Sequence, residues 1–281
     1  MNEYPLNGPG SQPGEGDGAE LDILQMPSGM MTYTHPGLPE PEAVGGLEQG
    51  LSLLQQLNRQ LCDYRADSLP DPIDLSGLDE ANRSLVDQVL GEGEVSIVLD
   101  GVEGSRIQES VLAGVWRLQQ RDKAGLLVAD RIEIGAIPRE VVTGAFEGAR
   151  DEALLCEPLP PGVLNAPPLF AEINEYSRDY QAGDPSHVIN LTLLPQTEAD
   201  LGFLQQQLGP GRVSILSRGY GNCRISSSGT RNVWWVQYFN SQDKNILNSL
   251  EITGVPNVAC AAAEDLADSA ERLEEILEIY L

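Results

Sequence analysis

The chain has 281 residues, and its 43 acidic and 17 basic side chains give a formal net charge of −26. A surface this acidic repels the phosphate backbone, which argues against nucleic-acid binding. The sequence has no run of 18 apolar residues, so no membrane-spanning helix is predicted.

The first 38 residues form an acidic segment that is rich in Gly and Pro. It has too few large apolar side chains to offset the entropy lost on ordering, so we expect a mostly disordered tail over residues 1–38. The segment lacks the basic and apolar regions of a secretory signal, which favours a cytoplasmic location. Residues 26–33 hold three of the four Met residues and predict either a strap packed on the domain or a partner-binding motif.

The next part, residues 39–156, is predicted to form a first α+β unit. Leu residues recur at spacings of three and four over residues 47–61, which indicates an amphipathic helix, and a Pro-containing linker follows at 68–72. Hydrophobic patterning then predicts a helix, four strands and a helix that begins at Pro138, at residues 78–90, 95–99, 106–110, 111–119, 126–134 and 138–154.

The remaining part, residues 157–281, is predicted to form a second α+β unit after a Pro-rich joint at 158–168. The expected elements are a short helix, a strand, a helix, four strands and a long acidic helix, at residues 170–180, 187–193, 197–208, 212–217, 222–228, 230–239, 246–252 and 258–280.

The two units align with each other at an offset of 118 positions without a gap. The aligned pairs include Val95 with Val213, Ile97 with Ile215, Arg106 with Arg224, Trp116 with Trp234, Gln119 with Gln237 and Ile134 with Ile252. We interpret this match as an internal duplication. Because strands follow one another without intervening helices, the predicted fold class is α+β, with two helix–antiparallel-sheet–helix units. Their sheets either join about a pseudo-two-fold axis or belong to two separate domains.

The sequence contains no recognisable catalytic or metal-binding motif. His35 and His187 are the only His residues, and GxSxG, HExxH and Walker motifs are absent. The four Cys are scattered without CxxC or CxxH spacing, which argues against structural zinc or a disulfide framework. We therefore expect no enzymatic activity and no cofactor.

Differences between the units indicate where a function could lie. Polar, aromatic and reactive side chains are concentrated in the second unit, where we predict a partner-binding site. The candidate residues are Arg218, Tyr220, Asn222, Cys223, Arg224, Arg231, Asn232, Trp235, Gln237, Tyr238 and Asn240.

Two of these candidates have alternative interpretations. Trp235 is expected on the opposite sheet face from Trp234, where it is either an exposed recognition residue or covered by a helix. Cys223 lies near two Arg residues in sequence, which could favour a thiolate that contacts a metal or an iron–sulfur cluster. The alternative is a buried, inert thiol.

Several long blocks resemble the HupH/HyaF/HoxQ family of hydrogenase expression/formation proteins. The block GRVSILSRGYGNCRISSSGTRNVWWVQYFN at 211–240 resembles the family's C-terminal region. MPSGMMTY, SRIQESVLAGVWRLQ, DRIEIGAIP and PSHVINLTLLPQTEADL resemble its other blocks, in family order. The resemblance extends from about Met26 to the C-terminus, and the length and acidity look like the HoxQ branch.

This resemblance implies an accessory protein for the maturation of an uptake [NiFe]-hydrogenase. Such proteins are thought to act in the cytoplasm on the iron–sulfur small-subunit precursor, before its twin-arginine export, beside a thioredoxin-like maturation chaperone. No catalytic residues are carried over from the family. The alternative hypothesis is a protein that transiently handles a metal or an iron–sulfur cluster through Cys223.

Overall fold

The computed structural model describes residues 45–66, 69–99, 105–219 and 221–280. The predicted disordered tail and the Met-rich strap at 26–33 lie outside these residues. None of the helices that the structure describes is long and apolar enough to cross a lipid bilayer.

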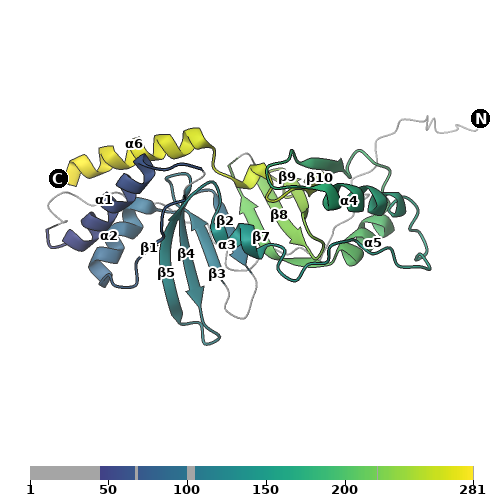
Figure 1. The fold of residues 1–281 in the computed structure, drawn as a ribbon, viewed down its shortest axis with the longest axis horizontal. Helices are drawn as coiled ribbons and strands as arrows, with labels where there is room; N and C mark the ends of the chain where they lie inside the picture. The colour runs from purple at the N-terminus through teal and green to yellow at the C-terminus, as the bar shows by residue number, and fades with distance from the viewer. Residues whose placement is uncertain (1–44, 67–68, 100–104, 220, 281) are drawn as a thin grey trace, which may run out of the picture. The chain divides into compact units, whose positions relative to one another are not determined.

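The chain alternates short helical segments with runs of strands (Figure 1). The first half contains α1 (Glu48–Cys62), β1 (Ile73–Asp74), α2 (Glu80–Leu90), β2 (Val95–Leu99), β3 (Ser105–Glu109), β4 (Val115–Arg121), β5 (Leu127–Ile134) and α3 (Arg139–Gly144). The second half contains α4 (Pro167–Asp179), β6 (His187–Asn190), α5 (Glu198–Leu208), β7 (Pro210–Ser217), β8 (Asn222–Ser228), β9 (Val233–Phe239), β10 (Asn245–Ile252), the 3₁₀ turn η2 (Asn257–Ala259) and α6 (Ala263–Tyr280).

All ten of these strands belong to one antiparallel sheet, in the order β1-β5-β4-β3-β2-β7-β8-β9-β10-β6. The halves meet where β2 pairs with β7, with Ile97 opposite Ile215 and Val95 opposite Ser217. Because Leu99 in turn lies opposite Val213, the register is that of a pseudo-two-fold axis between Ile97 and Ile215. The fold class is therefore α+β as predicted, with the two sheets joined rather than separate.

Local signals explain where the equivalent helices α2 and α5 begin. The Asp79 side chain caps α2 by accepting from the Asn82 N–H at 2.8 Å. Thr197 caps α5 in a capping box with Asp200, in which each side chain accepts from the other residue's backbone N–H. Such caps satisfy backbone donors that lack a partner inside the helix.

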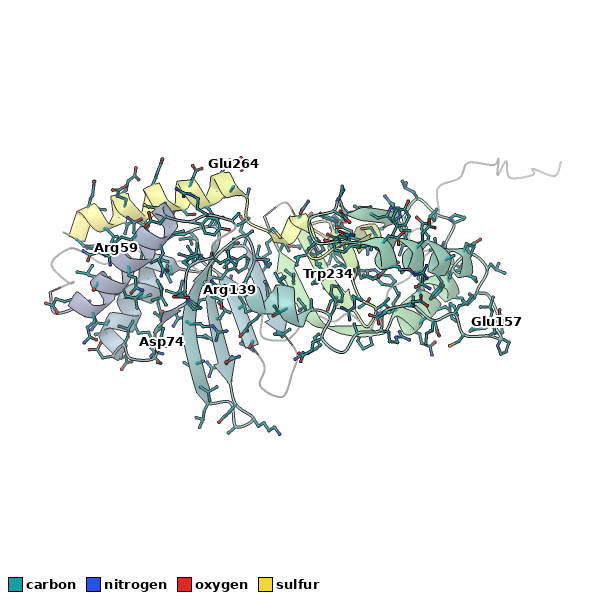
Figure 2. The ribbon with its side chains drawn as sticks, viewed as in Figure 1. Arg59, Asp74, Arg139, Glu157, Trp234 and Glu264 are labelled. Atoms are coloured by element: carbon teal, nitrogen blue, oxygen red, sulfur yellow. The ribbon has the colours of Figure 1, made fainter. Side chains whose placement is uncertain are left out.

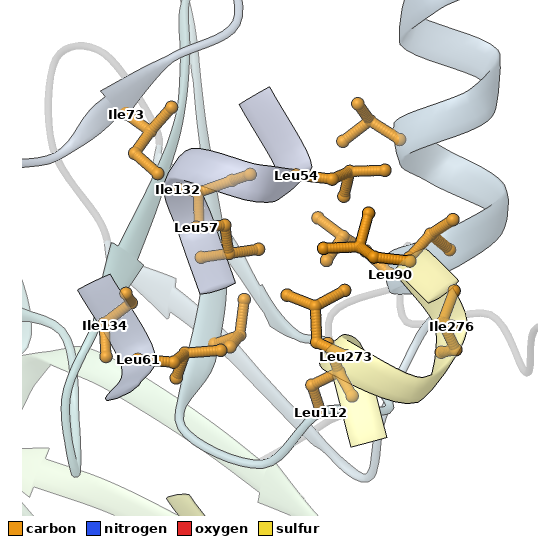
Figure 3. Close-up of a cluster of buried hydrophobic side chains, with 14 of the residues drawn as sticks. Leu54, Leu57, Leu61, Ile73, Leu90, Leu112, Ile132, Ile134, Leu273 and Ile276 are labelled. Carbon is orange, nitrogen blue, oxygen red and sulfur yellow. The ribbon is translucent and has the colours of Figure 1, made fainter. Parts of the chain in front are cut away.

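One hydrophobic core lies between the first-half strands and helices α1, α2 and α6 (Figure 3). Leu54, Leu57 and Leu61 form the buried stripe of α1 that the Leu spacing predicts, and they pack in one cluster with Leu273 of α6. The last helix of the chain thus completes the core of the first half. The sequence assigned this helix to the second unit, and the unit boundaries at 38/39 and 156/157 stay predictions.

A second core lies on the sheet face that α3 and η2 cover. Trp116 and Trp234 are fully buried in it, with Val141 from α3 and Ala259 from η2 (Trp234 is labelled in Figure 2). The indole N–H groups of both Trp residues donate to glycine carbonyls, Gly135 at 2.8 Å and Gly254 at 3.1 Å. The predicted core role of both Trp residues is confirmed.

Several predicted boundaries are wrong. The helix expected through residue 154 ends at Gly144, where Gly144 and the left-handed Gly148 (φ 77°) interrupt it. The strand expected over 111–119 begins only at Val115, because a turn through Gly114 (φ 76°) precedes it. The strand expected over 187–193 ends at Asn190, whose side chain bonds the following turn. The helix expected from residue 258 begins at Ala263, after η2.

Candidate protein-binding surface

Strands β8 and β9 distribute the candidate residues over both faces of the sheet. Arg224 lies opposite Gln237, and Cys223 lies opposite Tyr238. Because successive side chains of a strand point to opposite faces, the first pair shares one face and the second pair shares the other. The second pair lies on the face of Trp234, in or against the core that α3 and η2 cover.

The candidates also lie at opposite ends of these strands. Arg231 and Asn232 belong to the turn between β8 and β9. Asn222 begins β8, while Arg218 and Asn240 directly follow β7 and β9 at the other end. The structure therefore does not bring the candidate residues together into one site. Tyr220 lies outside the described residues.

Trp235 is buried, with 5 % of its surface exposed. Its indole Nε1 donates to Asn248 Oδ1 at 2.5 Å, so its polar group is satisfied internally. Helix α4 packs against the neighbouring strand β10. The interpretation of Trp235 as an exposed recognition residue is wrong, because its side chain is buried.

Cys223 is a buried thiol, with 1 % of its surface exposed. Burial raises the pKa of its thiol to about 12, against the smaller opposing effect of a hydrogen bond with Tyr238. Burial likewise raises the pKa of Tyr238 to about 12. The thiolate that Arg218 and Arg224 were expected to favour is therefore not formed near neutral pH, because neither residue offsets the burial.

No group of three or more His, Cys, Asp or Glu side chains that could hold a metal ion occurs in the part of the chain that the structure describes. Cys260, which could be a second ligand beside Cys223, is half-buried, and burial raises the pKa of its thiol to about 11. Neither Cys223 nor Cys260 is therefore a ready thiolate.

Three other candidates have structural roles. Asn232 adopts a left-handed conformation (φ 63°), and its carbonyl accepts from the Thr253 N–H at 2.8 Å. Asn240 Oδ1 accepts from the backbone N–H groups of Gln242 at 2.9 Å and Lys244 at 3.0 Å, which shapes the turn before β10. Gln237 is buried within β9.

Besides the half-buried Asn232, Tyr238 and Asn240, four of the described candidates reach the surface, and three of these four are Arg. Asn222 and Arg231 are exposed, whereas Arg218 and Arg224 are half-buried. The Arg224 guanidinium lies over the Phe239 ring at 4.7 Å, and Arg231 Nε bonds Asp151 at 2.9 Å. Such side chains can donate to carboxylates and carbonyls of a partner protein.

These side chains stand out against the charge of the whole protein. Residues 201–240 contain four Arg and neither Asp nor Glu, in a chain whose net charge is −26. Arg212 and Arg231 pair with Glu147 and Asp151, whereas Arg224 shares one face of β8 with Asn222. We call this face, which carries a basic side chain on an acidic protein, the locally basic face. Such a face is suited to contact with a partner protein.

The candidate set missed a group of exposed apolar side chains in the second half. Leu164 and Leu193 are 72 % and 80 % exposed. Comparison of the two units did not reveal them, because it searched for polar and reactive residues. Nothing in the sequence distinguishes these Leu residues from the Leu residues of the core.

Comparison with known proteins identifies the family. The profile described as "HupH hydrogenase expression protein, C-terminal conserved region" matches twice, at residues 47–156 and 163–280. Hydrogenase expression/formation protein HoxQ of Cupriavidus necator (strain ATCC 17699 / DSM 428 / KCTC 22496 / NCIMB 10442 / H16 / Stanier 337) is 49 % identical, covering 99 % of this chain and 98 % of the relative. HupH of Rhodobacter capsulatus is 48 % identical over 96 % and 94 % of the two chains.

A more distant relative is the Hydrogenase-1 operon protein HyaF of Escherichia coli (strain K12). It is 33 % identical and covers 98 % of this chain and 95 % of its own. The similarity thus extends over nearly the whole length of each relative. The chain belongs to the HupH family of hydrogenase expression/formation proteins.

Proposed function

We propose that this chain is a non-catalytic binding factor in the maturation of an uptake [NiFe]-hydrogenase. It binds the iron–sulfur small-subunit precursor in the cytoplasm before twin-arginine export, beside a thioredoxin-like maturation chaperone. The observation that carries the proposal is the near full-length similarity to proteins named for hydrogenase expression and formation.

The geometry supports binding through the locally basic face of the second half. Arg224 is held over Phe239 and Asn222 is exposed at the start of the same strand, so both belong to a rigid sheet rather than to a loop. Donors fixed in this way lose little side-chain entropy when they bind carboxylates or carbonyls of a folded partner.

The charge of −26 supports a second contact, with the basic signal region of the precursor. Opposite charges speed association and are screened by salt. Capture of the precursor is therefore expected to weaken as the salt concentration rises. Salt-independent capture would remove this electrostatic contribution.

The alternative, transient handling of a metal or cluster through Cys223, gains no support from the structure. The thiol is buried and protonated near neutral pH, as its raised pKa indicates. Nothing in the described residues favours it over binding, so we propose binding alone.

Co-purification from hydrogenase-expressing cells tests the proposal. The tagged chain is expected to capture the small-subunit precursor, and Arg224→Ala is expected to weaken capture about tenfold by removing a charged contact. Arg121→Ala is the matched control, because Arg121 is an exposed Arg on a first-half strand. Failure of the folded wild-type chain to capture the precursor would contradict the proposal, and equal capture by both variants would exclude the Arg224 surface.

A further inference from the structure

Three exposed Leu side chains form a feature that the proposed contacts do not use. Leu164, Leu193 and Leu194 are 72 %, 80 % and 37 % exposed. A single exposed Leu needs no explanation, whereas several from neighbouring loops commonly mark an interaction site. We call these three residues the leucine patch.

Hydrogen bonds tie the two loops of the leucine patch to each other. Asn165 Nδ2 donates to the Pro195 carbonyl at 2.6 Å, and Gln196 Nε2 donates to the Asn165 carbonyl at 3.4 Å. The residue after Leu164 is therefore bonded to the residue after Leu194. This places the loop that carries Leu164 beside the loop that carries Leu193 and Leu194.

The backbone of the leucine patch is also fixed by buried or turn-forming polar groups. Asp200, which is fully buried, accepts from the Leu164 and Asn165 N–H groups at 2.8 Å each. Asn190 Oδ1 accepts from the Leu193 N–H at 3.2 Å. The Leu residues are thus held out to solvent by a pre-ordered scaffold, which lowers the entropy cost of binding a partner.

The repeated architecture does not require this exposure. In the first half, Leu75 is equivalent to Leu191, because their backbone N–H groups donate at 2.9 Å to the equivalent carbonyls of Asp130 and Asn248, and both side chains are buried. At the same offset of 116 positions, Leu164, Leu193 and Leu194 correspond to Glu48, Gly77 and the half-buried Leu78. The two most exposed Leu residues of the patch, Leu164 and Leu193, are therefore specific to the second half, as is expected of a functional addition to a common fold.

The charge around the leucine patch indicates what could bind it. Residues 157–211 contain seven Asp or Glu and a single Arg, Arg178, which is bonded to Glu152 at 2.9 Å. Glu157 (Figure 2) and Glu198 lie on the loops and helix start that flank the patch, and both are exposed. An apolar surface with an acidic rim complements an apolar segment flanked by cations.

We propose that the leucine patch is the docking site for a segment of the small-subunit precursor in which Arg or Lys flanks a run of apolar side chains. This inference rests on the proposed function, because it takes the precursor as the partner. The loops before α4 and α5 bind the apolar segment with its flanking cations, and the face that carries Arg224 binds the folded part of the precursor.

The test compares matched variants of the full chain. One double variant is Leu164→Ser with Leu193→Ser, and its control is Leu126→Ser, which changes a Leu that is 66 % exposed beside β5. The probes are the purified precursor and a labelled synthetic peptide with two Arg before ten alternating Leu and Ala. A second peptide carries Glu in place of the Arg. Dissociation constants come from fluorescence anisotropy, and circular dichroism verifies folding.

The double variant is expected to bind both the precursor and the Arg peptide about tenfold more weakly, with the control unchanged. The Glu peptide is expected to bind the wild-type chain more weakly than the Arg peptide. Equal binding by the double variant and the wild type would overturn the inference, as would an equal loss in Leu126→Ser. Self-association that disappears in the double variant would also overturn it, by making the patch an interface between copies.

The outcomes separate this inference from the proposed function. If the wild-type chain and the double variant capture the precursor equally tightly, the proposed function stands and the leucine patch is excluded as the docking site. A wild-type chain that binds the Arg peptide through the patch but never the precursor would remove the proposed function and the assignment of the partner.

Discussion

The indole Nε1 of Trp235 donates to Asn248 Oδ1 at 2.5 Å, at the positions where the first half places an ion pair. The residues 118 positions earlier are Arg117 and Asp130, which are joined by bonds of 2.9 and 2.8 Å. The same cross-strand contact is thus ionic in one half and neutral in the other. The exchange allows an aromatic side chain to be buried in the second half without a charge beside it.

This relationship predicts that removal of the acceptor, Asn248 in one half or Asp130 in the other, lowers the free energy of unfolding by unequal amounts. Asn248→Ala leaves a buried indole N–H without a partner and is expected to lower the free energy of unfolding by about 1–3 kcal/mol. Asp130→Ala leaves the mostly buried Arg117 with only Asp87 and is expected to cost more, about 3 kcal/mol. Urea unfolding of both variants measures the difference. An Asn248→Ala chain as stable as the wild type would contradict the role of this bond.

The buried carboxyl of Glu109 predicts that the free energy of unfolding depends on pH. Burial, with repulsion from Glu94 and Asp265, raises the pKa of this carboxyl to about 7, despite a bond from the Gly114 N–H. Because the folded pKa exceeds the unfolded value, the folded state holds the proton more tightly between about pH 4.5 and 7. Stability is therefore expected to fall across this range, by about 3 kcal/mol in total from this group.

Glu109→Gln isolates this effect, because the amide keeps an acceptor for Gly114 and cannot ionise. The variant is expected to match the wild type near pH 5 and to exceed its free energy of unfolding at pH 8. Urea unfolding at pH 5, 6, 7 and 8 provides the comparison. A difference between the two proteins that is the same at every pH would exclude Glu109 as the titrating group.

The depressed pKa of Asp200 predicts that the protein loses stability in acid. The hydrogen bonds of Asp200 also predict that its substitution loosens the loop that carries Leu164. Burial opposes its ionisation, but bonds from Thr197 and from the backbone of Ala166 and Asn165 lower its pKa to about 2. A depressed folded pKa contributes stability above about pH 4, which is lost as the pH falls towards 2. Asp200→Ala is expected to cost about 3 kcal/mol at pH 7 and to speed amide exchange at Leu164.

Asp200→Asn is the matched control, because it keeps one acceptor oxygen and copies Asn82 at the equivalent first-half position. There, Asn82 Oδ1 accepts from the Gly50 N–H at 2.8 Å. The Asn variant is expected to lose about 1 kcal/mol. If both substitutions left amide exchange at Leu164 unchanged, Asp200 would not hold that loop.

Substitution of Gly114 tests how much the packing of α6 contributes to the stability of the first half. A Cβ at Gly114 would lie 2.4 Å from Leu266 Cδ2, in addition to the strain of its φ of +76°. Gly125 has a similar φ of +82° and nothing within 4 Å. Gly125→Ala is expected to cost about 1 kcal/mol through strain alone, and Gly114→Ala about 3 kcal/mol because it also displaces α6. Equal losses in thermal unfolding would show that the α6 contact is unimportant.

Local patterns in the sequence predicted much of the fold. The Leu spacing of α1 and the alternation in β2, β8 and β10 place the elements within a few residues. The 118-residue offset predicted the repeated order of elements, and Trp116 and Trp234 as core residues, because equivalent positions in related units share packing. These features depend on contacts between neighbours in sequence or between equivalent strands.

Features that depend on distant contacts were not predictable in this way. Nothing in the sequence of α6 shows that Leu273 joins Leu54 in the core of the first half. Trp235 has the same neighbours in sequence whether its side chain is buried or exposed, so its burial followed only from the packing. The apolar residues of the leucine patch resemble core residues in sequence, and only the structure shows them to be exposed.

The most direct test of the account mixes the purified chain with the purified small-subunit precursor and, separately, with the hydrogenase large subunit. Size-exclusion chromatography with light scattering then measures the mass of any complex. We expect a stable complex with the precursor and none with the large subunit. A folded chain that binds the large subunit and not the precursor would contradict the central claim that this protein acts on the small subunit.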